Sequence, residues 1–325
     1  MSVRIASVGV HIPQRRMSNE ELASMIDTTD EWIRSHTGIG NRHIAADGSL
    51  TSDLAADAAR SALARAGVGA TDLDFILVAT ATPDYFGFPS TACVIQEKLG
   101  AKGCAAFDIS AGCTGFIYAL EIAASMLEAR RGAHALVIGA ETLTRVTNWA
   151  DRSTCVLLGD GAGAAVLSRT DENGRGILDA ILGADGSGAK DLRLVQAERT
   201  TTFRPAAAMV PYLEMNGKSV YNFAVKTIVS LVEGLLAKGS HAMGDIDWVV
   251  PHQANARILQ AAAKRLGLPE SRFYMNMEEY ANTSSASIPI ALEEMDRKGL
   301  LKQGALVMLL GFGAGLTYGG ALLRW

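Results

Sequence analysis

The sequence predicts an α/β protein made of two duplicated halves, and two observations carry this prediction. Nearly uninterrupted apolar runs at 75–79 and 306–310 are typical of strands whose sheet is covered by helices on both faces. Short motifs also recur in the same order about 170 residues apart: 72–78 with 245–250, 119–121 with 291–293, and 135–137 with 305–307. We therefore expect two similar halves packed into one body, residues 1–172 and 173–325, joined around 171–175.

Local patterns set the order of the elements. Apolar periodicity, capping residues and Gly or Pro breakers predict strands at 4–10, 75–79 and 134–139 and helices at 18–26, 52–66 and 91–99. They also predict a short polar helix within 27–39, a loop at 80–90 and a Gly-rich strand pair at 156–167. The second half repeats this order. The run 159–163 lacks the GxGxxG spacing of a nucleotide loop and leads into a strand, so we expect close backbone packing there.

Composition indicates a soluble globular protein. The 325 residues are 49% apolar and 20% charged, with a formal charge of −4 and no face rich in arginine and lysine, which argues against nucleic-acid binding. The four cysteines form no CxxC pair and show no metal-ligand spacing, so we expect a reducing, cytoplasmic setting and no metal site. The N-terminus lacks a signal-peptide pattern, and no apolar run approaches the length that spans a membrane.

Cys113 is the first candidate catalytic residue. A strand ending at Ile109 is followed by small residues, then by Cys113, and then by apolar positions of helical period through Leu127. This pattern places the thiol near a helix N-terminus, where unpaired N–H groups and the helix dipole favour a thiolate. The flanking Gly112 and Gly115 allow a substrate to approach closely. Taken alone, the stretch equally allows a buried and inert cysteine.

Two residues of the second half complete a candidate constellation. His252 ends a predicted strand, at the carboxyl edge where ligands bind in α/β sheets, and Asn282 precedes a helix much as Cys113 does in the first half. Taken singly, His252 is interpreted as a structural histidine and Asn282 as a helix cap. Because the three residues occupy equivalent positions in two related halves, we predict that their side chains converge on one pocket.

These residues carry a family resemblance. The motifs AGCTGF at 111–116, PHQAN at 251–255, ANTS at 281–284 and GFGAG at 311–315 resemble the signatures of β-ketoacyl-acyl carrier protein synthase III, a condensing enzyme with the thiolase-like fold. DTTDEW at 27–32, TGI at 37–39, FPS at 88–90 and DR at 151–152 resemble that family as well. The similarity spans essentially the whole chain, and it implies a layered αβαβα body.

The resemblance implies a decarboxylative Claisen condensation that initiates fatty acid synthesis. Cys113 would take the acyl group from an acyl-CoA primer, and His252 and Asn282 would stabilise the enolate formed when malonyl-acyl carrier protein loses CO₂. Backbone N–H groups of Cys113 and Ala314 would hold the tetrahedral oxyanion, although the family usually has glycine where Ala314 stands. No cofactor is expected, because acyl-CoA is a substrate.

The resemblance also implies binding residues and a homodimer. Trp32 and Arg152 would sandwich the adenine of CoA. The residues expected to bind CoA are Thr28, Trp32, His36, Arg152, Gly217 and Asn255, and those expected to line the acyl pocket are Phe88 and Phe312. The acidic carrier protein would dock on Arg257, Lys264 and Arg265. His36 replaces an arginine common in the family and Asn222 a lysine found in some relatives, which predicts weaker or pH-dependent binding. Phe88 would close the acyl pocket of a partner subunit. A loop packed within its own chain, and a solvated helix face for the three cations, are the alternatives.

Several other functions remain open at this stage. A specialised homologue in polyketide or other secondary metabolism would use the same Cys, His and Asn for acyl transfer or starter condensation. A cysteine hydrolase would use Cys113 and His252 alone, and a non-catalytic CoA-binding scaffold would use neither. A biosynthetic thiolase needs a second cysteine within 311–315 and an elongating synthase a second histidine at Asn282, so the sequence excludes both. The primer's chain length and branching, and the choice between primary and secondary metabolism, do not follow from the sequence.

Overall fold

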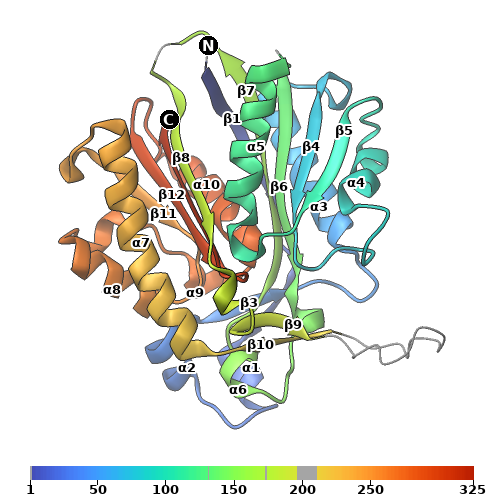
Figure 1. Cartoon of the computed structure of the whole chain (residues 1–325). Helices are drawn as coiled ribbons and strands as arrows, with labels where there is room; N and C mark the ends of the chain where they lie inside the picture. The colour runs from blue at the N-terminus through green and yellow to red at the C-terminus, as the bar shows by residue number, and fades with distance from the viewer. Residues whose placement is uncertain (1, 131, 173, 196–210) are drawn as a thin grey trace.

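The protein is built of two mixed β-sheets separated and covered by helices (Figure 1). The computed structural model describes residues 2–130, 132–172, 174–195 and 211–325. The first sheet has the order β1-β7-β6-β4-β5, formed by β1 (Ser2–His11), β7 (Asp160–Thr170), β6 (His134–Thr142), β4 (Phe75–Ala79) and β5 (Ala105–Ile109). The second has the order β8-β13-β12-β11, formed by β8 (Gly176–Ala184), β13 (Thr317–Arg324), β12 (Leu306–Gly313) and β11 (Trp248–Pro251).

The two sheets repeat one topology. In each, the first two pairs of neighbours run antiparallel and the third runs parallel: β1-β7, β7-β6 and β6-β4 correspond to β8-β13, β13-β12 and β12-β11. The parallel pair of β4 with β5 has its counterpart in a single parallel bridge between Val249 and Phe273. The predicted duplication is therefore present in the fold, whereas the boundary at residues 172 and 173 stays a prediction.

The repeated Asp-x-Asp motif has the same structural task in both halves. Asp74 precedes β4, and its carboxylate accepts hydrogen bonds from the N–H groups of Ala133 and His134, where β6 begins. Asp247 precedes β11, and its carboxylate accepts a hydrogen bond from the Leu306 N–H, where β12 begins. Each aspartate thus satisfies backbone donors at the start of a buried neighbouring strand, which explains why the motif occurs twice.

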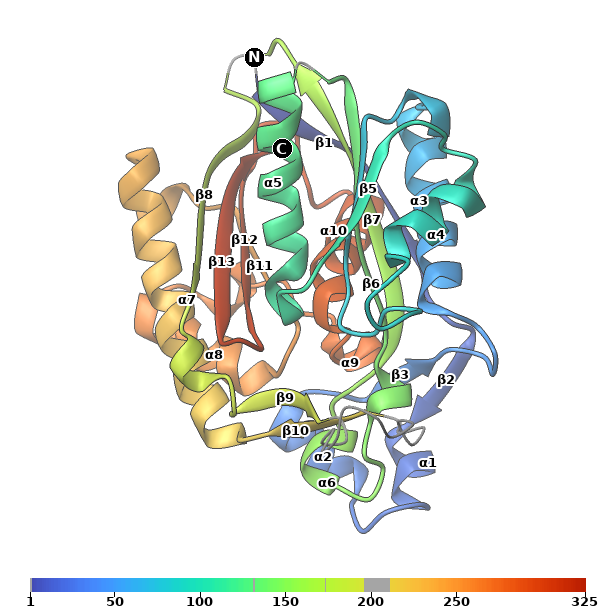
Figure 2. The same cartoon turned by 45° about the vertical axis from the view of Figure 1, so that its right-hand side comes forward.

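Helices form three layers around the two sheets (Figure 2). The helices α5 (Gly115–Arg130) and α10 (Ser287–Arg297) lie between the sheets, where they share a core with both. The outer face of the first sheet is covered by α3 (Thr51–Ala66) and α4 (Thr91–Leu99), and that of the second by α7 (Gly217–Gly239) and α8 (Ala256–Leu266). This arrangement confirms the expected αβαβα layering.

The Gly-rich run provides close packing, as predicted. A Cβ at Gly163 would lie 2.7 Å from the Pro289 side chain at the start of α10, so the glycine lets the helix contact the sheet directly. The expected strand pair at 156–167 is wrong in detail, because that part of the chain contributes a single strand, β7. The expected first helix is also shorter than predicted: α1 (Asn19–Ala23) ends where the chain turns at Ser24.

Small elements gather at one end of the molecule, at the bottom of both views (Figures 1 and 2). They comprise α1, β2 (Arg15–Ser18), α2 (Asp30–Thr37), β3 (Asn41–Ile44), α6 (Arg152–Cys155), β9 (Leu192–Val195), β10 (Tyr212–Met215) and α9 (Met277–Tyr280). β2 pairs with β3 and β9 pairs with β10, each antiparallel. Four of these elements, α2, α6, β9 and β10, contribute residues to the wall of the candidate site.

One expectation about apolar segments needs correction. The helix α7 is long and apolar enough to cross a membrane when judged by length and composition alone. In the structure, its residues Ile228, Leu231, Val232 and Leu235 are buried in the core that it shares with β12 and β13. The apolar character of α7 is therefore explained by its place in the fold.

Candidate active site

A cavity of about 330 Å³ lies where the two halves meet, and Cys113, His252 and Asn282 all line it. The first half contributes Cys113 and the second half contributes His252 and Asn282. The wall is mostly apolar, with Leu143, Leu157, Leu194, Leu213, Met215 and Phe312 among its residues. The predicted convergence of the three side chains on one pocket is thus what the structure shows.

Cys113 sits in the 3₁₀ turn Gly112–Thr114, directly before α5. The end of β12 packs tightly against it: a Cβ at Gly313 would lie 2.9 Å from the Cys113 Cβ and 3.2 Å from its Sγ. Gly112 has a φ of +51°, a conformation that glycine adopts without strain. The two glycines therefore let the nucleophile's turn fit between the halves.

The Cys113 thiol is protonated at neutral pH, contrary to the expectation of a thiolate. One side of the residue opens on the cavity and the sulfur is otherwise enclosed, and this burial raises the pKa of Cys113 to about 12. The side chain of Ser284 lowers that pKa through a hydrogen bond, and the nearby Glu141 carboxyl raises it further. Desolvation thus outweighs the hydrogen bonds that lower the pKa of this thiol.

His252 follows β11 and is held on several sides. Its backbone N–H donates to the Leu310 carbonyl at 2.7 Å, and its ring meets that of Phe312 edge-on with centroids 5.4 Å apart. Its Nδ1 lies 2.7 Å from the Ser287 hydroxyl oxygen. Burial lowers the pKa of His252 to about 3, so the imidazole is neutral, as the proposed role as a hydrogen-bond donor requires.

Asn282 is fixed through both its backbone and its side chain. Its N–H donates to the Leu157 carbonyl at 2.9 Å, and its own carbonyl accepts from the Gly159 N–H at 3.1 Å. Its Oδ1 accepts from the Ser284 N–H at 2.9 Å, whereas its Nδ2 has no acceptor among the residues that the structure describes. Asn282 is not the N-cap of α10, whose N-cap is Ala286. The free Nδ2 is therefore available to a ligand in the cavity.

Ala314 lines the cavity beside the nucleophile's turn. Its backbone N lies 3.1 Å from where a Cβ on Gly112 would be, and its N–H has no acceptor within the described parts of the chain. Its carbonyl accepts from the Thr317 hydroxyl at 2.8 Å, which holds the turn after β12. This placement suits the oxyanion role expected of the Cys113 and Ala314 N–H groups, which stays a prediction.

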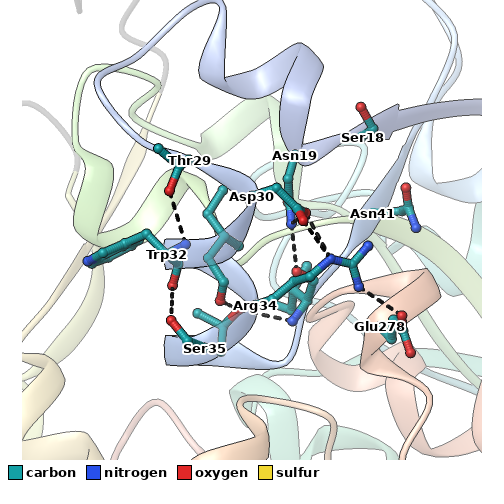
Figure 3. A network of polar contacts seen from close by, with 12 residues as sticks. Ser18, Asn19, Thr29, Asp30, Trp32, Arg34, Ser35, Asn41 and Glu278 are labelled. Atoms are coloured by element: carbon teal, nitrogen blue, oxygen red, sulfur yellow. Dashed lines mark hydrogen bonds and ion pairs between the residues drawn. The ribbon is translucent and has the colours of Figure 1, made fainter.

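The far end of the cavity contains most of the residues expected to bind CoA. Trp32, His36, Gly217 and Asn255 line it, and the Arg152 guanidinium lies 4.7 Å from the centre of the Trp32 ring. His36 stacks on Trp32 with centroids 4.4 Å apart, and its Nδ1 lies 2.8 Å from the Trp32 carbonyl oxygen. Figure 3 shows Trp32 pointing away from the ion-paired side of its helix. The Arg152 guanidinium lies over the Trp32 ring and already stacks on it, so the expected sandwich is not open in this structure, and a purine would enter between the two only after the Arg152 side chain moves.

Other predicted residues lie outside the cavity wall. Thr28 is near this end, with a buried Oγ1 that has no hydrogen-bond partner in the described structure. The Phe88 side chain is 91% exposed, so it does not contribute to the cavity of its own chain. The three cations of the expected docking surface are exposed on α8, and no carboxylate of the described residues forms an ion pair with them: Arg257, Lys264 and Arg265.

Sequence reasoning missed the residues that support the three candidates. Ser284 and Ser287 belong to a hydroxyl-rich run after Asn282, and this run was the available signal, because helix starts rarely need so many hydroxyl groups. Glu141, in β6, is fully buried and accepts hydrogen bonds from the Ala81 N–H and from the Thr82 and Ser285 hydroxyls. No pattern in the sequence marks this carboxyl as a neighbour of Cys113.

Comparisons with known proteins agree with this geometry. The model of the family described as 3-Oxoacyl-[acyl-carrier-protein (ACP)] synthase III matches residues 107–186, and the model of its C-terminal part matches residues 236–325. Beta-ketoacyl-[acyl-carrier-protein] synthase III of Clostridium tetani is 45% identical over 332 residues, which cover 99% of this chain and 98% of that protein.

Solved structures are similar to this chain as well. The crystal structure of 3-oxoacyl-[acyl-carrier-protein] synthase III from Aquifex aeolicus has a TM-score of 0.92 at 41% identity, covering 99% of this chain and 100% of that chain. The priming β-ketosynthase from the R1128 polyketide biosynthetic pathway also has a TM-score of 0.92, at 38% identity, covering 99% of this chain and 96% of the other.

Proposed function

The chain belongs to the 3-oxoacyl-[acyl-carrier-protein] synthase III family of condensing acyltransferases, and from this premise we propose that it condenses an acyl-CoA primer with malonyl-acyl carrier protein at the start of fatty acid synthesis. The observation that carries the proposal is the single cavity lined by Cys113, His252 and Asn282, with Trp32 at its far end. The products are 3-ketoacyl-acyl carrier protein, CoA and CO₂.

In the first step, the Cys113 sulfur attacks the thioester carbonyl of the primer. The bond between the acyl carbon and the CoA sulfur breaks, and the thiol proton of Cys113 ends on the sulfur of CoA. The Cys113 and Ala314 N–H groups face the oxygen that becomes negative in the tetrahedral intermediate. The apolar wall around Leu143 and Phe312 then holds the acyl chain.

In the second step, the malonyl thioester loses CO₂ and the electrons of the broken carbon–carbon bond form an enolate. The His252 Nε2–H and the Asn282 Nδ2–H donate to the enolate oxygen, and removal of one such donor typically costs about 3–4 kcal/mol of the activation free energy. The enolate carbon attacks the acyl-Cys113 thioester. The Cys113 thiolate leaves as the new carbon–carbon bond forms, and it is then reprotonated.

The proposal includes a homodimer. The strand β5 is an edge of the first sheet, and three aromatic side chains on the loop before α4 are largely exposed: Tyr85, Phe86 and Phe88. An open sheet edge beside exposed aromatic rings favours a second copy of the chain as their cover. Phe88 would then complete the partner's acyl pocket.

The proposal extends to partners and location. The cations Arg257, Lys264 and Arg265, which form no ion pair with the residues that the structure describes, offer a docking surface to the acidic carrier protein, and charge reversal there should raise the KM for the carrier protein alone. The reaction requires no cofactor and no metal, because the substrates supply the thioester and the leaving CO₂. We place the enzyme in the cytoplasm, where its acyl-CoA and carrier-protein substrates are made, with no membrane or nucleic-acid partner.

A second candidate rests on the similarity to the R1128 priming β-ketosynthase, whose name assigns it to polyketide synthesis. Intact-mass spectrometry separates condensation from acyl transfer without condensation and from hydrolysis. The protein is incubated with acetyl-CoA and with longer and branched acyl-CoAs, and malonyl-acyl carrier protein is then added. Acylation of Cys113 by short primers followed by a 3-ketoacyl product supports the fatty acid role, whereas acyl-Cys113 that does not react with malonyl-acyl carrier protein favours a specialised acyl transfer. Steady release of free acid indicates a hydrolase.

A further inference from the structure

Arg42, in β3, is a fully buried cation to which the reaction assigns no role. Its Nη1 donates to the Asn19 Oδ1 at 2.9 Å and its Nη2 donates to the Val156 carbonyl at 3.0 Å. Among the described residues its Nε has no hydrogen-bond partner and no carboxylate forms a direct ion pair with it; the Asp30 carboxylate acts on it only at longer range. Burial lowers the pKa of Arg42 to about 10, which leaves it charged at neutral pH.

The segment that Arg42 contacts is the one that holds Asn282. Val156 begins a short stretch, residues 156–159, whose next members bond to the backbone of Asn282 on both sides. The side chain of Arg42 also lies against Gly159, where an added Cβ would be 3.3 Å from the Arg42 Cβ. Residues 156, 157 and 158 line the cavity. The Arg42 guanidinium thus supports the backbone segment 156–159, which in turn holds Asn282.

The other side of the guanidinium is anchored to a rigid network. Asn19 donates through its Nδ2 to the Asp30 carboxylate and to the Ile39 carbonyl, each at 2.8 Å. Asp30 also accepts from Arg34, whose second contact is Glu278 in α9, just before Asn282 (Figure 3). The Asn282 segment is therefore tied to this part of the chain at Val156 and again at Glu278.

We propose that Arg42 is a positioning residue for Asn282, acting through the Val156 carbonyl and the segment 156–159. Taking a cation out of water is costly, and replacing buried ionic groups by apolar ones is often neutral or stabilising. A buried arginine without a carboxylate partner is therefore explained better by the geometry it fixes than by net stability. The two terminal nitrogens of the guanidinium bond Asn19 and Val156 in a fixed fork, which the single nitrogen of a lysine does not reproduce.

The variant R42K tests this inference, which rests on the proposed function. Lysine keeps the charge but has a single nitrogen. We expect Cys113 acylation by acyl-CoA to stay within about twofold of wild type and condensation with malonyl-acyl carrier protein to fall at least about tenfold, because a lost enolate donor costs about 10²–10³ in rate. The matched control is R272K, since Arg272 also donates to backbone carbonyls, those of Ile246 and Asp247, but outside the cavity. It should leave both steps unchanged.

A double-mutant cycle separates positioning from general loosening. If Arg42 acts through Asn282, then R42K adds no further loss of condensation in the N282A background. Equal losses in acylation and condensation, or additive losses with N282A, would overturn the inference. If R42K does not fold, N19A releases the guanidinium from its other side and should give the same pattern with a smaller loss.

One readout needs no substrate. A crystal structure of R42K should show residues 156–159 and the Asn282 side chain displaced relative to wild type, while Cys113 and His252 keep their places. An unmoved Asn282 would contradict the inference whatever the enzyme's activity. Absence of condensation by the wild-type protein would instead count against the proposed function, so the two failures are distinct.

Discussion

The Nδ1 of His252 lies 2.7 Å from the Ser287 hydroxyl oxygen, and the direction of this hydrogen bond decides which ring nitrogen carries the proton. The hydroxyl has one proton and two acceptors within reach, because the Ser284 carbonyl oxygen lies 2.8 Å away. Because a carbonyl oxygen can accept two hydrogen bonds, it can take both the Ser287 N–H and this hydroxyl proton. The enolate-donor role proposed for Nε2–H requires instead that the hydroxyl donate to Nδ1. The remaining proton of the neutral ring is then on Nε2, on the donor side that the condensation needs.

We therefore expect S287A to slow condensation about fivefold to tenfold, because the hydrogen bond that fixes the tautomer contributes about 1–1.4 kcal/mol. Acylation of Cys113 should change little, which separate assays of the two half-reactions will show. The matched control is S168A, since the Ser168 hydroxyl makes the same contact with the Nδ1 of His134 at 2.8 Å in the first sheet. An unchanged condensation rate in S287A would contradict the tautomer assignment.

Alkylation of Cys113 should depend steeply on pH. With the pKa of the thiol raised to about 12 by burial, the thiolate fraction rises about tenfold for each pH unit across the neutral range. Iodoacetamide labelling, followed by peptide mass spectrometry between pH 6 and pH 9, measures this slope. The variant C113S identifies labelling at the other three cysteines. A rate that levels off below pH 8 would show that the resting site favours the thiolate after all.

The sequence was sufficient for the fold and the three candidates, because each depends on local chain geometry. Strand ends and helix starts follow from apolar periodicity. The duplication then places the strand ends and helix starts of the first half opposite the equivalent positions of the second half. Arg42 and Ser287 could not be found in this way, because their roles depend on contacts between segments far apart in the chain. The protonation of Cys113 was predicted wrongly for a related reason: burial is a property of the packed cavity, and here desolvation raises the pKa of the thiol more than its hydrogen bonds lower it.

Acid should destabilise the protein partly through His252. The folded-state pKa of His252 is about 3 and the ordinary value is 6.5, so only the unfolded chain takes up this proton between these pH values. The associated stability is fully present above pH 6.5 and is lost as the pH falls towards 3, by at most about 1.4 kcal/mol per pH unit. Urea unfolding of wild type and H252Q at pH 7, 6 and 5 measures the difference between them. The carboxyl groups titrate in both proteins, so their contribution cancels when the two free energies of unfolding are subtracted. If the free energy of unfolding had the same pH dependence in both proteins, His252 would not be buried in its neutral form.

The contact between the end of β12 and the nucleophile makes Gly313 intolerant of a side chain. In G313A the new Cβ would lie 3.0 Å from the Cys113 backbone N and 3.2 Å from its Sγ, so the nucleophile's turn or the strand must shift. We expect a loss of about 1–3 kcal/mol in the free energy of unfolding, as is typical of overpacking, together with slower acylation of Cys113. Gly244 is the matched control, because a Cβ there has no atom within 4 Å. Chemical denaturation and intact-mass acylation assays of G313A and G244A measure both effects, and acylation by G313A at the wild-type rate would mean that the strand end yields without moving the sulfur.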